Sequence, residues 1–181
     1  PDRTLPTVLE ELVSQRRVAN VFALCMCGRR GTLTLGPPRS DPRRATSWTA
    51  AKGDSFYGVQ LQRIQLGATA LAPKEPPAAT IVDSGTTFMY LHSAAFLPLL
   101  AAMRARRCVT LKPAAAPSDE FCVRLPFGGS LALLDRCYDN VTVVLPGATL
   151  SMPPSAYFYA AEDAGQYCMG VFNNYERALV L

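Results

Sequence analysis

The feature that most constrains this chain is the run Thr80-Ile81-Val82-Asp83-Ser84-Gly85-Thr86-Thr87. Apolar residues typical of the end of a buried strand are followed by one aspartate and then by a tight turn of Ser, Gly and Thr. Gly85 lets the backbone turn where a Cβ would clash. The hydroxyls of Thr86 and Thr87 can hold the Asp83 carboxylate in one orientation. The run therefore predicts an ionisable pair of oxygens at the floor of a cleft.

The short string Asp-Ser-Gly-Thr is also an ordinary turn or helix-start sequence, because Asp and Ser cap helices and Gly favours turns. The flanking residues favour a catalytic role. The apolar pair Ile81-Val82 precedes the turn and the apolar residues 88–91 follow it, so the pattern is a buried strand, a turn and a second strand. A surface helix cap would not need such flanks. We therefore predict that Asp83 lies in a loop at the end of a buried strand and faces a cleft.

Composition excludes several classes of protein. The 181 residues are 49% hydrophobic and 18% charged, which is typical of a globular domain with a proper core. No apolar run approaches the ~20 residues of a membrane helix, so no membrane segment is expected here. The net charge is +4, with arginine pairs scattered over the chain. A nucleic-acid module would need a basic stripe interleaved with aromatic residues, and we expect no nucleic-acid partner.

Both ends of the sequence suggest a piece of a longer protein. It begins Pro1-Asp2-Arg3, with no initiator Met and no signal-peptide pattern. It ends on an apolar run, 178–181, that looks like an unfinished strand. We expect a longer parent protein, so the lack of a targeting signal in this stretch carries little information.

The cysteines predict an oxidising compartment rather than a metal site. Six cysteines lie at positions 25, 27, 108, 122, 137 and 168. Cys25-Met26-Cys27 is too tight for the usual zinc knuckle and His92 is the sole histidine, so no metal is expected. A secretory-pathway protein with disulfides is the better interpretation. Asn140-Val141-Thr142 fits the glycosylation sequon and agrees with that compartment, although a sequon in a strand can stay unmodified.

Hydrophobic periodicity predicts a strand-rich chain with one or two helices. The expected helices span residues 5–13 and 93–107. Ser93 is expected to cap the second helix, and Pro98 to kink it or move its start. Loops are expected over 28–31, 37–54 and 112–118. Strands are expected over 18–26, 32–35, 56–66 (as one strand or two), 80–82, 88–91, 141–145, 150–152 and 167–172.

The Asp83 run resembles the second active-site signature of pepsin-like aspartic peptidases, family A1, and is closest to plant- and alga-type members. The resemblance covers nearly the whole chain in the family's order. The segments that carry it are the helix 5–13 with strand 21–25, the hairpin 31–36, the strands 56–61 and 64–67, Pro153 to Tyr157, and Tyr167 to Phe172. No single segment is specific, but the ordered set is.

This resemblance implies an all-β, pepsin-like acid protease fold, mostly the second lobe, with one or two short helices. Residues 1–50 would be the end of the N-terminal lobe and a linker, and residues 51–181 the C-terminal lobe. The implied activity is aspartic endopeptidase, without cofactor, in which one aspartate from each lobe activates a water molecule. The implied compartment is the secretory pathway, with a vacuolar, lysosomal or extracellular destination.

Site residues follow from the resemblance position by position. Asp83 would be the second-lobe catalytic aspartate, and Gly85 would allow the turn. Thr86 would brace the loops of the two lobes by a hydrogen bond across their junction. Ser84 and Thr87 would lie near the substrate or support the Asp83 oxygens. The implied partners are a peptide or protein substrate and the N-terminal lobe of the same chain.

The resemblance also has implications for the bridges and for the last strand. It implies that Cys168 pairs with either Cys122 or Cys137, and that Cys25 and Cys27 have partners in missing segments. Residues 179–181 would begin a strand that threads past the catalytic aspartate. Because the sequence contains one Asp-[Ser/Thr]-Gly motif, this stretch alone is expected to be inactive.

Two other functions remain open. The first is a non-catalytic binding or inhibitor-like protein on the same fold, which an intact Asp-Thr-Gly-Ser in the first lobe would argue against. The second is a retroviral-type peptidase that works as a homodimer. In that class the motif lies near the start of a short chain, whereas here it lies at position 83 of 181, so this interpretation ranks last.

Overall fold

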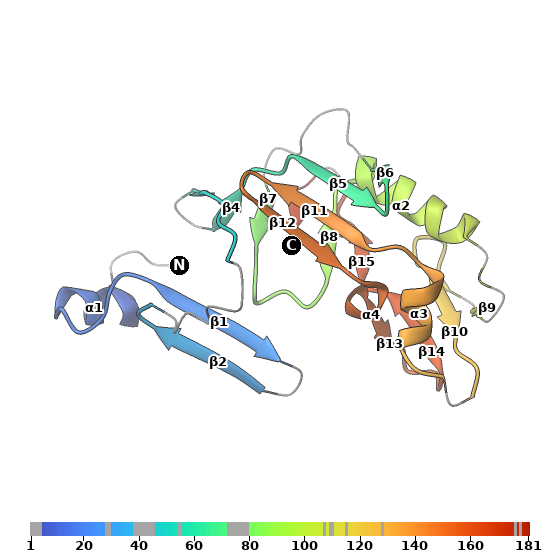
Figure 1. Ribbon diagram of the computed structural model, residues 1–181, viewed down its shortest axis with the longest axis horizontal. Coiled ribbons are helices and arrows are strands. Elements are labelled where there is room, and N and C mark those ends of the chain that lie inside the picture. Colours follow the sequence, from blue (N-terminus) through green and yellow to red (C-terminus); the bar gives the residue numbers. More distant parts are fainter. Residues whose placement is uncertain are drawn as a thin grey trace. The chain divides into compact units, whose positions relative to one another are not determined.

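The computed structural model describes residues 5–27, 30–37, 46–53, 56–71, 80–106, 108, 111–114, 116–127, 129–175, 177 and 179–181. The chain divides into two compact units, residues 1–46 and residues 47–181. Figure 1 shows the elements of each unit. The assignment of residues 1–50 and 51–181 to two lobes stays a prediction.

Where the structure describes the first unit, it has one helix and one hairpin. Helix α1 (Val8–Ser14) begins with a capping box, in which Thr7 Oγ1 accepts from the Glu10 amide at 3.2 Å and Glu10 Oε2 accepts from the Thr7 amide at 2.6 Å. Strands β1 (Phe22–Cys27) and β2 (Arg30–Leu35) pair antiparallel. The first strand therefore starts later than expected. Of the expected 28–31 turn, residues 28–29 lie outside the described residues and 30–31 belong to β2.

The described residues of the second unit form three sheets. A six-stranded sheet has the order β15 (Val171–Asn173), β8 (Met89–Leu91), β16 (Leu179–Val180), β7 (Thr80–Val82), β4 (Tyr57–Val59) and β3 (Ala51–Lys52). A second has the order β12 (Ala148–Met152), β11 (Val141–Leu145), β5 (Arg63–Leu66) and β6 (Thr69–Ala70). The third has the order β13 (Phe158–Ala160), β14 (Gln166–Met169), β10 (Cys122–Arg124) and β9 (Lys112–Pro113). The all-β prediction is confirmed.

Several predicted strands have different bounds in the structure. The 56–66 segment forms two strands, β4 and β5, which belong to different sheets. The 167–172 segment also divides into β14 and β15, because the chain changes sheets at the buried Gly170. A Cβ on this glycine would lie 3.0 Å from the Phe88 ring. Strand β9 lies in a segment expected to be a loop.

Strand β16 runs through the middle of the six-stranded sheet. It pairs parallel with β7 and antiparallel with β8, and Leu179 is fully buried. The Leu181 amide donates to the Ile81 carbonyl at 2.9 Å, and the Asp83 amide donates to the Leu181 carbonyl at 3.1 Å. The last residues of this sequence therefore lie against the strand that leads to Asp83, as the family resemblance implied.

Helix α2 (Ser93–Ala105) packs an apolar face into the core of this unit. It contains Pro98, and Phe96, Leu99 and Met103 are buried. The N-cap is His92, not Ser93: His92 Nδ1 accepts from the Ala94 amide at 3.1 Å. The Ser93 hydroxyl instead donates to Asn173 Oδ1 at 2.9 Å. The prediction that Ser93 caps this helix was therefore wrong, because a long-range partner takes its hydroxyl.

The described residues form four helices where one or two were expected. The additional ones are α3 (Ala132–Cys137), of six residues, and α4 (Pro154–Tyr157), of four. Neither is long enough to show a helical period in the sequence. Asp135 Oδ1 accepts from the Ser155 amide at 2.7 Å, so a side chain of α3 satisfies an amide in the first turn of α4. No helix in the described part of the chain is both long and apolar enough to cross a bilayer.

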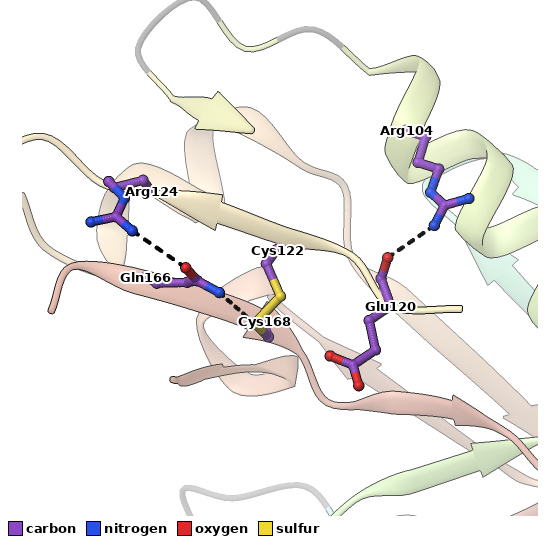
Figure 2. The surroundings of a disulfide bond; sticks show 6 residues. All are labelled: Arg104, Glu120, Cys122, Arg124, Gln166 and Cys168. Atoms are coloured by element: carbon purple, nitrogen blue, oxygen red, sulfur yellow. Dashed lines mark hydrogen bonds between the residues drawn. A yellow bond between two sulfur atoms is a disulfide. The ribbon is translucent and has the colours of Figure 1, made fainter. Parts of the chain in front are cut away.

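Two disulfides cross-link the second unit. Cys122 and Cys168 are directly opposite each other on β10 and β14, and their bridge closes a separation of 46 residues. Figure 2 shows this bridge with the Gln166 amide directed at Cys168 Sγ and the Arg104 guanidinium on the Glu120 carbonyl. Of the two pairings left open for Cys168, the structure has the one with Cys122. The bridge of Cys137 is to Cys108.

Candidate functional site

Asp83 occupies the first position after strand β7, in the loop that leads to β8. Its backbone is held by the Leu181 carbonyl, and its own carbonyl accepts from the Thr86 amide at 3.3 Å. The side chain is partly exposed, whereas Thr80 at the start of the strand is buried. The aspartate therefore sits at the end of a strand and does not cap a helix.

Both oxygens of the Asp83 carboxylate accept hydrogen bonds from its own loop. The Thr86 hydroxyl donates to Oδ2, and the Gly85 amide donates to Oδ1 at 2.9 Å. These two bonds, the one from Thr86 first, lower the pKa of Asp83 below its ordinary value, because they stabilise the ionised form. A Cβ at position 85 would lie 3.2 Å from Oδ1, so glycine allows this close approach.

The other two residues of the predicted site take less direct positions. Ser84 and Thr87 are exposed in the same loop, and the described donors to the carboxylate are Gly85 and Thr86. Thr86 is turned to Asp83 within its own loop, and its expected contact across a lobe junction stays a prediction. The roles of Ser84 and Thr87 near a substrate also stay predictions.

A cavity of about 330 Å³ lies elsewhere in the second unit. An ion pair between Arg106 and Asp139, 3.5 Å apart and half-exposed, stands at its wall. Asp83 is not among the residues that line it, so the cleft expected in front of Asp83 stays a prediction. The lining residues are Leu66, Thr69, Ala102, Met103, Ala105, Arg106, Tyr138 and Asp139.

One cluster of potential metal ligands occurs in the described part of the chain: Glu120, Cys122 and Cys168. Both sulfurs of this cluster belong to the disulfide in Figure 2, so neither is a thiolate that could bind zinc. Cys25 lies exposed on β1, and the Cys27 side chain lies outside the described residues. This arrangement favours a structural role for the Cys122–Cys168 pair.

We expect Thr86→Val to raise the pKa of Asp83 toward its ordinary value. The variant removes the hydrogen bond that lowers this pKa most. The folded-state pKa is depressed, so the stabilisation that these bonds give is present above the unfolded pKa. It is lost as the pH falls through the folded pKa. In Thr86→Val the two pKa values lie closer together, so less stability is lost and the loss is complete at a higher pH. A ¹³C NMR titration of the Asp83 carboxyl measures the shift.

Thr86→Ser is the matched control, because it keeps the hydroxyl and should leave the titration of Asp83 nearly unchanged. Equal titration curves for Thr86→Val and the unaltered protein would show that the Thr86 hydroxyl does not hold the carboxylate.

The chemistry available here is that of one ionised carboxylate in a fixed orientation. Such a group can take a proton from a water molecule, but a second group must donate a proton to the substrate in the same step. Comparison with known protein families gives a match over residues 56–181, the larger part of the chain, to the family model described as xylanase inhibitor C-terminal. The matched region includes the Asp83 loop, β16 and both disulfides.

Proposed function

Because this chain belongs to the xylanase inhibitor C-terminal family, a family of pepsin-like aspartic peptidase domains, we propose that it supplies one catalytic carboxylate of an aspartic endopeptidase. The observation that carries the proposal is the Asp83 carboxylate, which two donors of its own loop keep ionised and oriented. Its position directly after β7, which pairs with β16, supports the proposal, since a catalytic group needs a rigid frame.

In the proposed reaction Asp83 is one member of a pair. Two carboxylates that lie close together cannot both ionise, so they share one proton and titrate as a unit. The ionised member takes a proton from the attacking water, and the protonated member donates to the peptide carbonyl oxygen. The second carboxylate would come from the first lobe of the same protein. The substrate is a peptide or protein, and no cofactor takes part.

A second candidate is a non-catalytic, inhibitor-like protein on the same fold. The family's description, which names an inhibitor of xylanase, favours it. The single Asp-[Ser/Thr]-Gly motif of this sequence fits both candidates. An aspartate in the matching motif of the first lobe would favour the peptidase, and another residue there would favour the inhibitor-like protein.

Hydrolysis of a peptide library by the full-length protein, followed from about pH 3 to pH 7, tests the proposal. We expect cleavage with a bell-shaped pH dependence, since one carboxyl must be ionised and the other protonated. A full-length protein that folds but cleaves none of the peptides at any of these pH values would overturn the peptidase and leave the inhibitor-like candidate.

The two disulfides and the family favour an extracellular or vacuolar protein. In such a compartment we expect a glycan on Asn140, which is exposed just before β11. Its side-chain amide donates to Ser151 Oγ at 3.1 Å. In the secreted full-length protein, treatment with a glycosidase should lower the mass by that of the glycan. Asn140→Gln should lack this glycan, so that the glycosidase no longer changes the mass at this site. Thr142→Ser keeps the sequon and should keep the glycan. An unmodified Asn140 peptide from the secreted protein would contradict this prediction.

A further inference from the structure

We propose that Asn173 is a positioning residue for Asp83, a role that rests on the proposed function of that aspartate. Asn173 is the last residue of β15 and its side chain is partly buried. Its Oδ1 accepts two hydrogen bonds, from the Ser93 hydroxyl at 2.9 Å and from the Tyr175 amide at 2.9 Å. One acceptor atom therefore joins the end of β15 to the start of α2 and to the next turn of its own chain.

Backbone hydrogen bonds join the same two segments. The Asn174 amide donates to the Leu91 carbonyl at 2.8 Å, and the Ser93 amide donates to the Tyr175 carbonyl at 2.9 Å. Residues 173–175 thus lie along residues 91–93, where β8 ends and α2 begins. Tyr175 has a φ of 55°, a conformation that a residue with a Cβ adopts rarely, so this turn needs contacts that hold it. The amide of that residue donates to Asn173 Oδ1.

Sheet topology connects this turn to the candidate site. Strands β15 and β16 flank β8 on opposite sides, with β15 parallel and β16 antiparallel to it. The turn at 173–175 lies beyond the end of β8, beside residues 91–93. On this proposal, its position determines how β16 lies in the gap between β8 and β7, and so that Leu181 reaches Asp83.

The far end of this connection is the Asp83 backbone. Leu181 follows β16 and accepts the Asp83 amide at 3.1 Å, while its own amide donates to Ile81. A shift of β16 along β7 would withdraw that acceptor and loosen the loop whose Gly85 and Thr86 orient the carboxylate. Asn173 touches neither Asp83 nor its loop in the described contacts, so it acts through β16. Ser93 is available for this contact because His92 supplies the cap of α2.

Three variants of the full-length protein test the proposal. Asn173→Leu keeps the size of the side chain and removes the acceptor. Asn173→Asp keeps an oxygen that can accept both hydrogen bonds. Ser93→Ala removes one of the two donors. The readouts are amide hydrogen exchange at Asp83 and Leu181, with Val143 of β11 as the reference, and kcat and KM for a cleaved peptide.

For Asn173→Leu we expect exchange at Asp83 and Leu181 to accelerate about tenfold, as the loss of one or two hydrogen bonds allows, with Val143 unchanged. The kcat should fall while KM stays the same, since the variant misplaces a catalytic group rather than a binding surface. Asn173→Asp should restore both readouts, and Ser93→Ala should give a smaller change in the same direction.

Three results would overturn the positioning role. The first is unchanged exchange at Asp83 in Asn173→Leu. The second is equal acceleration at Val143, which would show a general loss of stability. The third is an Asn173→Asp variant as impaired as Asn173→Leu. If Asn173→Leu does not fold, Ser93→Ala decides by the same comparison. Absence of hydrolysis in the unaltered protein would instead count against the proposed function, and the exchange result would still decide the role of Asn173.

Discussion

Asp83→Asn in the full-length protein is expected to lower kcat for peptide hydrolysis by about 10²–10⁴-fold, the usual contribution of a positioned acid–base group. The amide occupies the same space; its oxygen can accept from the Gly85 amide, and its NH2 can donate to the Thr86 hydroxyl, so the loop should keep its shape. What the variant loses is the group that ionises. Since the pair of carboxylates titrates as a unit, no pH between about 3 and 7 should restore the rate.

Asp119→Asn is the matched control, because Asp119 is an exposed residue of the 118–120 turn region and the same charge is removed there. It should hydrolyse peptides at the unaltered rate. Full activity in Asp83→Asn would refute the role of this aspartate, and equal losses in both variants would point to a general effect of charge. Circular dichroism of both variants checks that the fold is kept.

Replacing both Cys122 and Cys168 by alanine is expected to lower the free energy of unfolding by about 4 kcal/mol, from the entropy of closing a long loop in the unfolded chain. The sequence separation of 46 residues sets this magnitude. Both side chains are buried between β10 and β14, so the replacements also leave small vacancies that add to the loss. Denaturant unfolding of the full-length protein, followed by fluorescence, measures the change.

The single variants Cys122→Ala and Cys168→Ala provide the control for this prediction. If the covalent bond is the source of the stability, each single variant should lose nearly as much as the double variant. Additive single effects would show that packing, not the bond, dominates. Peptide mapping without reductant that found Cys168 unbridged would contradict the pairing itself.

Local patterns were enough to predict the part of the fold that presents Asp83. The strand, the tight turn and the second strand were readable because apolar flanks around a Ser-Gly-Thr turn leave few other structures, although the end of β7 is less buried than expected, with Val82 exposed. The Thr86 contact was also predicted from the sequence, whereas the described second donor is the Gly85 amide and not the expected Thr87 hydroxyl. Helix α2 was found from its apolar face, although its N-cap residue, His92, was not.

The features that the sequence did not predict all depend on distant partners. Ser93 is a good N-cap by type, but Asn173, 80 positions away, takes its hydroxyl. The Cys108–Cys137 bridge depends on where α3 packs, and α3 is too short to be predicted. The division of 167–172 between two sheets depends on the buried Gly170 beside Phe88. None of these features is determined by residues that are close in the sequence.

The pairing of β16 with β7 has a consequence during synthesis. The Asp83 loop leaves the ribosome on the order of a hundred residues before Leu181, which corresponds to a delay of about 5–20 s at usual elongation rates. Until then the amide of Asp83 lacks the carbonyl that holds it, and the gap between β7 and β8 is unfilled. A nascent chain would carry Asp83 without this backbone contact, so its loop can be held as described only after β16 has been made.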